Sequence, residues 1–366
     1  MGTQNGVHFD TSDLALQTTL RERINAYFLD RGLSKHADRR MIAKIVFFLC
    51  GSAGLWGLLV SGVVPALWAI PVSLLLGFVL AGVGFNVAHD AIHGSFSPTP
   101  WVNRVLAHSF DLMGASSYTW SRAHNFVHHT YTNVPGVDED LEPGPWMLLY
   151  PRENPPVIYR FQHLYSLVLY SFTTLVWVFK KDFQQVFALD PRTGQRTPSL
   201  EIAKMIGWKV IHLTLFLAVP MVVSGYAWWQ VIVGYLLIHA ALGVTSSVVF
   251  QLAHVVEGPA LLPPEEVQHS WAEHQLLTTS NFAPNSRFAA FFFGGLNHQV
   301  EHHLFSKICH IHYPALAPIV RELAREHGLP YYEHPGFFDA LGSHLRLMQQ
   351  FGRGTSPDFR LAAEET

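Results

Sequence analysis

Four long apolar stretches divide the chain, and each is long enough to cross a lipid bilayer, which takes about 20 residues. They cover approximately residues 42–62, 66–87, 208–224 and 228–250. The first two are joined only by GVVP and the last two only by SGYAW, so each pair predicts a helical hairpin through a membrane. The pattern indicates an all-α membrane protein with four transmembrane helices.

A fifth apolar stretch, residues 164–179, is shorter and contains serine and threonine. It is compatible with a further span or with a helix that lies along the membrane interface. A fifth span would place the segments before and after it on opposite sides of the membrane, which would separate the histidine clusters described below. We therefore expect an interfacial or re-entrant helix at 164–179.

The lysines and arginines test this topology independently. Of the 24 lysines and arginines, all except Lys44 and Lys209 lie in the N-terminal segment, in the loop 88–207 or after residue 250. Neither hairpin tip contains a lysine or an arginine. Because positive charges favour the cytoplasmic side, both termini and this loop are predicted to be cytoplasmic. The predicted organisation is a cytosolic N-terminal segment (1–40), a membrane domain (41–335) and a cytosolic C-terminal tail (336–366).

Composition mainly excludes other classes of protein. Hydrophobic residues make up 49% of the chain and charged residues 14%, which leaves too little polar surface for a soluble globule of this length. The net charge of −3 offers no basic excess for binding nucleic acid. Two cysteines cannot form a disulfide framework. The N-terminal segment shows no apolar run with a cleavage site, so we expect no removable signal peptide.

Histidine occurs 22 times and is clustered at the predicted cytoplasmic ends of the spans. HDAIH (89–93) and HNFVHH (124–129) each contain an i,i+4 pair, which a helix places on one face. QLAH (251–254) ends the fourth span, and NHQVEHH (297–303) follows it. The candidate metal ligands are His89, His93, His124, His128, His129, His254, His298, Gln299, His302 and His303.

A single histidine pair is usually only an exposed helix surface, but here several clusters reach one membrane face at a similar depth. So many imidazoles exceed the needs of one ion and suit two. Structural zinc sites are four-coordinate and often sulfur-rich, and a zinc hydrolase needs three ligands. An all-nitrogen dinuclear site favours iron used in dioxygen chemistry. The distant alternative, a metal transporter or a membrane cytochrome, would need ligands at mid-membrane depth.

Two other histidines, His212 and His239, lie inside predicted spans, where an ionisable side chain is a functional candidate. For both we expect hydrogen bonds within the helix bundle instead. Because imidazoles bring no negative charge, nearby carboxylates should orient their N–H groups and balance two cations. The candidates are Asp90, Asp138, Asp140, Glu257 and Glu301. DEDLEP (138–143) is equally compatible with a solvated acidic loop, and a role for His274 beside the metal is left open.

Five segments together resemble the membrane fatty-acid desaturases: HDAIHGS, HNFVHHTYTN, DEDLEP, FQLAHVVEG and NHQVEHHLF. The resemblance covers about residues 40–335. It implies four spans with a cytosolic helical cap that holds two iron ions. It also implies ligand roles for the box residues His89, His93, His124, His128, His129, His302 and His303, and His254 matches an additional histidine that follows the fourth span.

The third box begins with Gln299, where many family members have histidine. This resembles the branch that inserts a double bond between an existing one and the carboxyl end, and the linoleoyl-CoA desaturase-like proteins. Gln299 could bind metal through its carbonyl oxygen or a water, and His298 is a further candidate. The N-terminal segment is too short for the cytochrome domain fused to some relatives. The resemblance therefore implies a separate electron-donor protein of ferredoxin or cytochrome type.

The implied reaction removes two hydrogens from an acyl chain, using dioxygen and two electrons. The substrate would be a fatty-acyl chain linked to CoA or to membrane lipid, held in an apolar tunnel between the spans. A histidine-box hydroxylase of lipids or alkanes is the nearest alternative, because it would share the metal site. The residues specify neither the acyl chain nor the position of the new double bond.

Overall fold

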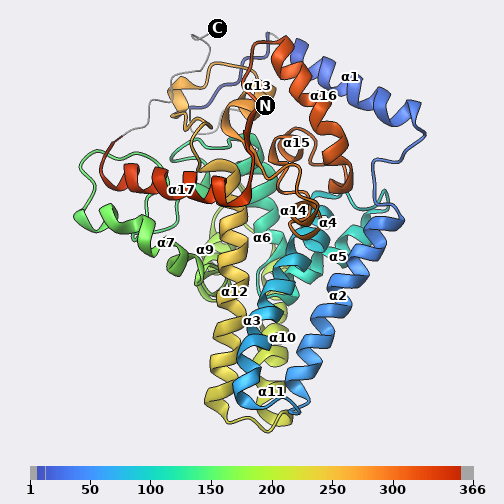
Figure 1. Ribbon diagram of the computed structural model, residues 1–366, viewed down its shortest axis with the longest axis vertical. Coiled ribbons are helices and arrows are strands. Elements are labelled where there is room, and N and C mark those ends of the chain that lie inside the picture. The colour runs from blue at the N-terminus through green and yellow to red at the C-terminus, as the bar shows by residue number, and fades with distance from the viewer. Residues whose placement is uncertain (1–5, 13, 356–366) are drawn as a thin grey trace. The chain divides into compact units, whose positions relative to one another are not determined.

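The computed structural model describes residues 6–12 and 14–355, which are mostly helical and fall into two compact units, each with its own interior (Figure 1). Unit 1 comprises Met1–His36, His124–Ser166 and Val249–Thr366, of which the described part is meant here. Unit 2 comprises Ala37–Ala123 and Leu167–Val248. Three of the four boundaries between the units fall within η2 (Ala123–His128), α7 (Gln162–Tyr170) and α12 (Trp228–His254), and the fourth, between His36 and Ala37, falls in the segment before α2 (Arg39–Val60).

Unit 2 contains the long apolar helices. By length and composition, four helices are suited to cross a membrane: Arg39–Val60, Ala66–His93, Ser199–Val223 and Trp228–His254. The prediction of four spans is therefore confirmed. The second is continuous through α3 (Ala66–Val83), a π-helical turn η1 (Gly84–Ala88) and α4 (His89–His93). The others are α2 (Arg39–Val60), the run α10 (Ser199–Leu213), η6 (Thr214–Ala218) and α11 (Val219–Val223), and α12 (Trp228–His254).

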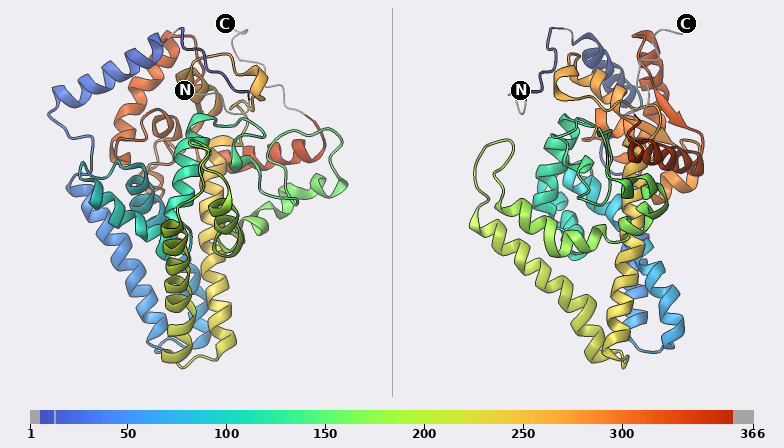
Figure 2. Two further views of the ribbon diagram at one scale, coloured as in Figure 1. Left: turned by 180° about the vertical axis from the view of Figure 1, so that it is seen from behind. Right: turned by 90° about the vertical axis from the view of Figure 1, so that its left-hand side faces the viewer.

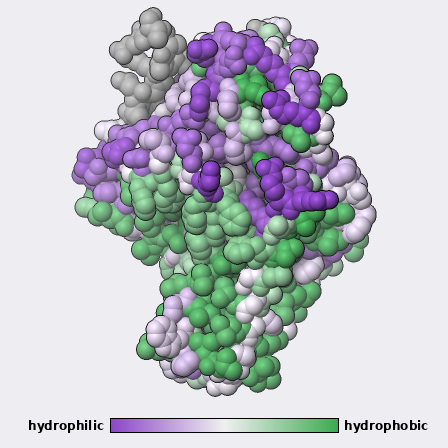
Figure 3. Space-filling view, turned by 45° about the vertical axis from the view of Figure 1, so that its right-hand side comes forward, coloured by the Kyte–Doolittle hydropathy of each residue, from purple (hydrophilic) through white to green (hydrophobic). Residues whose placement is uncertain are grey.

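These four helices differ from the prediction mainly in length. The second and fourth extend beyond 87 and 250, so that the first histidine box and His254 lie in their last turns. Their outer side chains are exposed and apolar; Phe47, Trp68 and Val222 are 58%, 65% and 85% exposed. The narrow lower part of Figure 3 shows one face of this surface, which is largely green. Such a surface is typical of contact with lipid hydrocarbon.

Small residues bring these helices close together. A Cβ atom at Gly82 would lie 2.2 Å from the ring of Phe48, and one at Gly77 would lie 2.2 Å from the Ile238 carbonyl oxygen. Helix α3 therefore packs tightly against both α2 and α12, as small residues allow in membrane helices. The turn between α2 and α3 uses Gly62 with φ +69°, a conformation that favours glycine.

The two intramembrane histidines form hydrogen bonds inside this bundle, as expected from the sequence. His212 Nδ1 lies 2.9 Å from the Leu112 carbonyl oxygen, and its Nε2 lies 3.0 Å from the Tyr235 hydroxyl and 3.3 Å from His239 Nε2. His239 Nδ1 lies 3.0 Å from the Thr174 hydroxyl. The network links α10 and α12 to the shorter segments of unit 2, so its polar groups need no water.

The stretch 164–179 does not form one long helix. It breaks into α7 (Gln162–Tyr170), α8 (Thr173–Val176), the π turn η5 (Trp177–Lys181) and α9 (Asp182–Phe187). It is not among the candidate spans found in residues 6–12 and 14–355. Val168, Phe172, Val176 and Phe179 recur at helical spacing and are exposed. This apolar stripe fits a helix at the membrane interface, which stays a prediction. Two further helices of unit 2 are α5 (Pro100–Leu112) and α6 (Ser117–Arg122).

Four helices of unit 1 share one apolar core. They are α1 (Ala15–Asp30), α13 (Trp271–Thr278), α15 (Gln299–Leu304) and α16 (Tyr313–Glu326). Leu20, Leu276, Val300 and Leu323 each contribute a buried side chain. Figures 1 and 2 show α1 lying along α16, where Arg23 pairs with Glu326 at 2.8 Å. The third histidine box is thus built on a helix whose other face is fixed by packing.

The remaining elements of unit 1 are short, except for one helix. Two three-residue strands, β1 (Ser280–Phe282) and β2 (Tyr332–His334), pair in parallel with Asn281 opposite Glu333, a small exception to the all-α prediction. Helix α14 covers Arg287–Phe292, and the 3-10 turns are η3 (Glu139–Leu141), η4 (Val157–Phe161), η7 (Pro264–Glu266) and η8 (His310–His312). The predicted C-terminal tail carries helix α17 (Phe337–Gly352), whose Met348 carbonyl accepts a hydrogen bond from Gln162; residues 356–366 lie outside the described chain.

A buried histidine in helix α17 predicts that the stability of the fold depends on pH. His344 is fully buried and its Nδ1 donates to the Val255 carbonyl oxygen at 2.7 Å. Burial lowers the pKa of His344 to about 4, from 6.5. Between pH 6.5 and about 4, His344 binds a proton in the unfolded chain but not in the folded one. Lowering the pH through this range therefore destabilises the fold by about 1.4 kcal/mol per pH unit through His344.

The variant His344→Gln should therefore show a shallower fall of melting temperature between pH 6.5 and 4 than the unmodified protein. Glutamine can still donate to the Val255 carbonyl but cannot take up a proton. Thermal unfolding in detergent at a series of pH values measures both slopes. Equal slopes would show that His344 does not titrate in this range.

Candidate metal centre

The second histidine box lies on a π-helical turn, η2 (Ala123–His128), and π turns are frequent at functional sites. His124 and His128 stack, with ring centroids 5.0 Å apart and an interplanar angle of 18°. His129 Nε2 lies 3.2 Å from His124 Nε2. All three side chains are buried. The box therefore turns its imidazoles toward one small volume inside unit 1.

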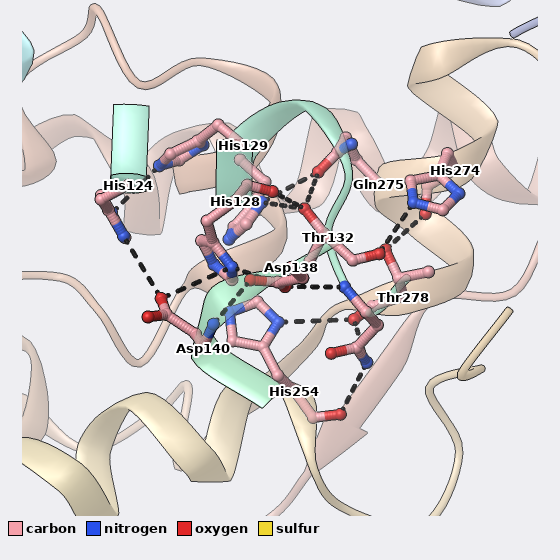
Figure 4. Close-up of polar contacts among 12 residues, drawn as sticks. His124, His128, His129, Thr132, Asp138, Asp140, His254, His274, Gln275 and Thr278 are labelled. Carbon is pink, nitrogen blue, oxygen red and sulfur yellow. Dashed lines mark hydrogen bonds and ion pairs between the residues drawn. The ribbon is translucent and has the colours of Figure 1, made fainter. Parts of the chain in front are cut away.

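Two carboxylates from the acidic loop face this box, as Figure 4 shows. Asp138 accepts the Nδ1–H of His128 at 2.9 Å and also the backbone N–H of Asn133 at 3.0 Å. Asp140 Oδ2 lies 3.7 Å from His128 Nδ1 and 3.9 Å from His124 Nδ1. Asp138 is buried, whereas Asp140 is 44% exposed. Asp138 is thus placed to orient His128, whereas Asp140 belongs to the exposed part of the loop, so a role of both carboxylates beside a metal stays a prediction.

His128, His254 and His303 form a group that could hold a metal ion. One ring nitrogen from each lies within 4.8 Å of the others, and all three residues are buried. His254 ends α12, and His303 lies on α15. The three residues come from segments up to 175 positions apart in sequence, between 128 and 303. The structure thus brings one histidine from the second box, one from the third and the isolated QLAH histidine together.

The same three histidines share a second feature, which is that each has its Nδ1 next to an oxygen acceptor. His128 donates to Asp138, His254 Nδ1 lies 3.4 Å from the Thr278 carbonyl, and His303 Nδ1 lies 2.8 Å from Gln275 Oε1. Among the described residues, neither His254 Nε2 nor His303 Nε2 has a hydrogen-bond partner. Histidines that bind metal usually donate the other N–H in this way. The orphaned Nε2 atoms fit a metal ion.

The remaining histidines of the second and third boxes lie beside this group. The ring of His129 is 4.6 Å from that of His302 and 4.3 Å from that of His303. His124 and His302 have ring centroids 6.2 Å apart. His124, His128 and Asp140 form a second group whose ligand atoms lie within 4.8 Å of one another. Unit 1 therefore holds two groups of potential metal ligands that share His128.

The first box belongs to unit 2. His89 and His93 end the second long helix just after the π turn η1, and both are buried. Their ring centroids are 4.7 Å apart, and the half-buried Trp120 lies at 5.8 Å and 6.1 Å from them. Asp90 Oδ1 lies 3.9 Å from His89 Nδ1. The i,i+4 spacing thus pairs the two imidazoles as expected.

The other predicted residues differ in their surroundings. Glu257 binds Arg346 through both carboxylate oxygens, so its charge is balanced by that surface arginine rather than by a box histidine. Glu301 is fully buried and accepts from Asn281 and the Tyr331 hydroxyl at 3.0 and 2.7 Å. Its Oε2 is 3.7 Å from His298 Nδ1, whereas no described group of potential ligands includes His298. Gln299 is buried, and its Oε1 finds no donor among the described residues.

Burial keeps His303 neutral. Desolvation, and then the neighbouring His129 and other histidines, hold the pKa of His303 well below its usual value of 6.5. A neutral imidazole is the form that binds metal. Burial also lowers the pKa of His274, to about 3. His274 donates from Nε2 to the Thr132 carbonyl at 2.8 Å, so it supports the second box without being a ligand itself.

Sequence analysis missed the residues that orient these ligands. Thr132 and Gln275 both contact His303, and the Asn133 side chain donates to the carbonyls of His254 and Thr278 at 2.9 and 3.2 Å. Figure 4 shows Thr132, Gln275 and Thr278 beside the histidines of the second box. The available signal was weak. It consisted of the polar residues of the segment QLLTTSN (275–281). The structure buries the whole segment.

Comparisons with known proteins agree on one family. The family model described as fatty acid desaturase matches residues 63–335. The chain is 34% identical to the sn-1 linoleoyl-lipid 6-desaturase of Synechocystis sp. over 94% of its length and 98% of that protein. It is 33% identical to the protein of the same name from Arthrospira platensis, with 95% of each chain covered. It is 32% identical to the acyl-lipid (8-3)-desaturase of Physcomitrium patens, over 91% of this chain and 71% of that one.

Proposed function

We infer, because this chain belongs to the fatty acid desaturase family, that its clustered histidines hold two iron ions used to desaturate a membrane-bound acyl chain. The coarse function follows from the family itself. The protein is an oxidoreductase of the membrane, it acts on a fatty-acyl chain, and its histidine clusters are compatible with metal binding. The relatives found are desaturases, so the hydroxylase alternative is not favoured.

The observation that carries the iron proposal is the group of His128, His254 and His303, with Nδ1 atoms next to oxygen acceptors and two Nε2 atoms left without partners. We propose that this group binds one iron. His89, His93, His124, His129 and His302 would complete the ligand set for two. Gln299 is a further candidate because of its buried, unsatisfied Oε1. His298 is a weaker one. An all-imidazole set suits iron, but also other transition metals, so metal identity is part of the proposal.

When bound, the two irons would supply dioxygen activation and the removal of two hydrogens, chemistry that no side chain provides. The chain's own residues prepare the site. Asp138 keeps a proton on His128 Nδ1, so that Nε2 presents its lone pair. Asp138 and Asp140 supply negative charge that the imidazoles lack. The buried side chains of both boxes exclude water from the reacting volume.

We propose that the substrate is an acyl chain linked to membrane lipid, as the names of two full-length relatives suggest. The same names suggest a substrate that is already unsaturated and a new double bond at position 6. Unit 2 contains a cavity of about 290 Å³, lined mostly by apolar side chains that include Leu67, Ile70, Phe216 and Val233. It lies toward the hairpin tips, at the ends of the spans away from His89 and His93, where it fits a hydrocarbon segment remote from the first box. A CoA-linked substrate is the alternative that product analysis must separate.

Orientation and electron supply are also proposed. The distribution of lysine and arginine supports cytoplasmic termini and a cytoplasmic metal centre, with residues 41–335 as the membrane domain. The reaction consumes two electrons, so we propose a separate donor protein of ferredoxin or cytochrome type at this face.

Expression in a host that is fed linoleic acid tests the function. The expected product has two hydrogens fewer than the substrate, with the new double bond between the existing ones and the carboxyl end. It should appear first in glycerolipids rather than in the acyl-CoA pool. Gas chromatography with mass spectrometry of both fractions measures this against a host with an empty vector. A product that gains one oxygen would support a hydroxylase instead, and a product that appears first in acyl-CoA would contradict the lipid-linked substrate.

A further inference from the structure

Helix α13 carries no histidine of the three boxes, yet it contacts the ligands of the metal group. Gln275, in the middle of this helix, is fully buried. Its Oε1 lies 2.8 Å from His303 Nδ1 and 2.9 Å from the Thr132 hydroxyl. One turn later, the Thr278 carbonyl lies 3.4 Å from His254 Nδ1. The helix therefore faces two of the three histidines of this group.

The helix is a rigid platform for these contacts. Its first turn is closed by a capping box, in which Ser270 and Glu273 bond each other's backbone N–H groups. Ala272 and Leu276 hold an adjacent face of the helix in the apolar core shared with α15, the helix of the third box. A polar side chain on such an element can hold a ligand in place more firmly than one on a loop.

The contact between Gln275 and His303 links an amide orientation to a histidine tautomer. With the amide oxygen toward His303, Nδ1 must carry the proton and Nε2 has a free lone pair. With the amide nitrogen toward His303, Nδ1 must accept, so the proton moves to Nε2 and blocks metal binding. With the amide oxygen toward His303, the single hydrogen of the Thr132 hydroxyl must go to Gln275 Oε1 at 2.9 Å; with the amide nitrogen there, it is free to go to the His128 carbonyl at 2.7 Å. Both networks are self-consistent, but only the first produces a ligand.

We propose that Gln275 is a positioning residue that holds His303 in the metal-binding tautomer. The inference rests on the proposed iron site and adds a residue outside the boxes to it. The Nε2 atom of Gln275 finds no acceptor in the described part of the chain. An unsatisfied buried N–H carries a cost, which the two contacts of the amide oxygen with His303 and Thr132 must offset. A carboxylate at this position would present oxygen in both orientations.

Two substitutions separate this role from simple packing. Gln275→Met keeps the length of the side chain but removes the acceptor, and should weaken binding of the iron at His303 by about 10–100-fold. Gln275→Glu keeps an oxygen toward Nδ1 and should bind iron at least as tightly as the unmodified protein. Gln268→Met is the matched control, because Gln268 is exposed and bonds only weakly to the Glu265 carbonyl, at 3.4 Å.

Iron affinity is measured on purified full-length protein by competition of Fe²⁺ with a chelator, and melting of the metal-free form reports folding. The proposal expects Gln275→Glu to bind iron at least as tightly as the unmodified protein and Gln275→Met to bind it more weakly. The melting temperatures of the three metal-free proteins should be similar. If the Met variant does not fold, the Glu variant decides: retained affinity supports the proposal, and lost affinity overturns it. A folded Met variant with unchanged affinity also overturns it. An unmodified protein that binds no iron would contradict the proposed function itself.

Discussion

Replacing His128 by alanine should abolish both product formation and binding of at least one iron. His128 belongs to both metal-binding groups of unit 1, one with His254 and His303 and one with His124 and Asp140. Its loss also frees Asp138, a buried carboxylate that is bonded to the His128 ring. Changes to the residues that surround a metal ligand typically lower metal affinity by about 10–100-fold, and the loss of His128 should lower iron affinity by more than this.

The matched control is His327→Ala, because His327 is exposed at the end of α16 and has no clustered histidine beside it. Iron per chain is measured by inductively coupled plasma mass spectrometry and product by gas chromatography. The control should keep both. A His128→Ala variant with full iron and full product would remove this histidine from the site.

The second large effect concerns stability rather than catalysis. Lys209, in α10, pairs with Asp182, and both side chains are almost completely buried, at 8% and 5% exposure. Lys209 also donates to the Gly114 and Trp177 carbonyls, and Thr119 donates to Asp182 at 2.8 Å. Asp182→Leu should leave a buried ammonium without its counter-charge and destabilise unit 2 by about 3–5 kcal/mol.

The double variant Asp182→Leu with Lys209→Met tests the cause. Removing both charges takes away the uncompensated ammonium, so most of the lost stability should return. Unfolding in a series of mixed detergents measures the three proteins under the same conditions. A double variant as unstable as the single one would show that packing of Asp182, and not its charge, is what matters.

The membrane helices could be predicted from the sequence because hydropathy depends on local composition. All four spans were found, and the errors were at their ends, where helices continue past the lipid-facing residues. These errors matter, since they concern the turns that carry His89, His93 and His254. The π turns η1 and η2 were not predicted, because they arise from backbone geometry that leaves no residue pattern.

The histidine clusters could be predicted for a different reason, which is that their spacing and side-chain chemistry are both local; that their members bind metal stays a prediction. The groups around them could not. Asp138 was found because it lies ten residues from His128, whereas Gln275 lies 28 residues from His303 and has no motif. Glu257 is the opposite case, and its role beside the metal stays a prediction. It lies near His254 in sequence, but an arginine 89 residues later takes its charge.

The iron content of His93→Ala tests the proposed ligand set most directly, in which the first histidine box takes part in binding two irons. The account predicts two irons per chain in the unmodified protein, a lower iron content in His93→Ala and no product from it, as for His128→Ala. Two irons per chain in a folded His93→Ala protein would contradict it.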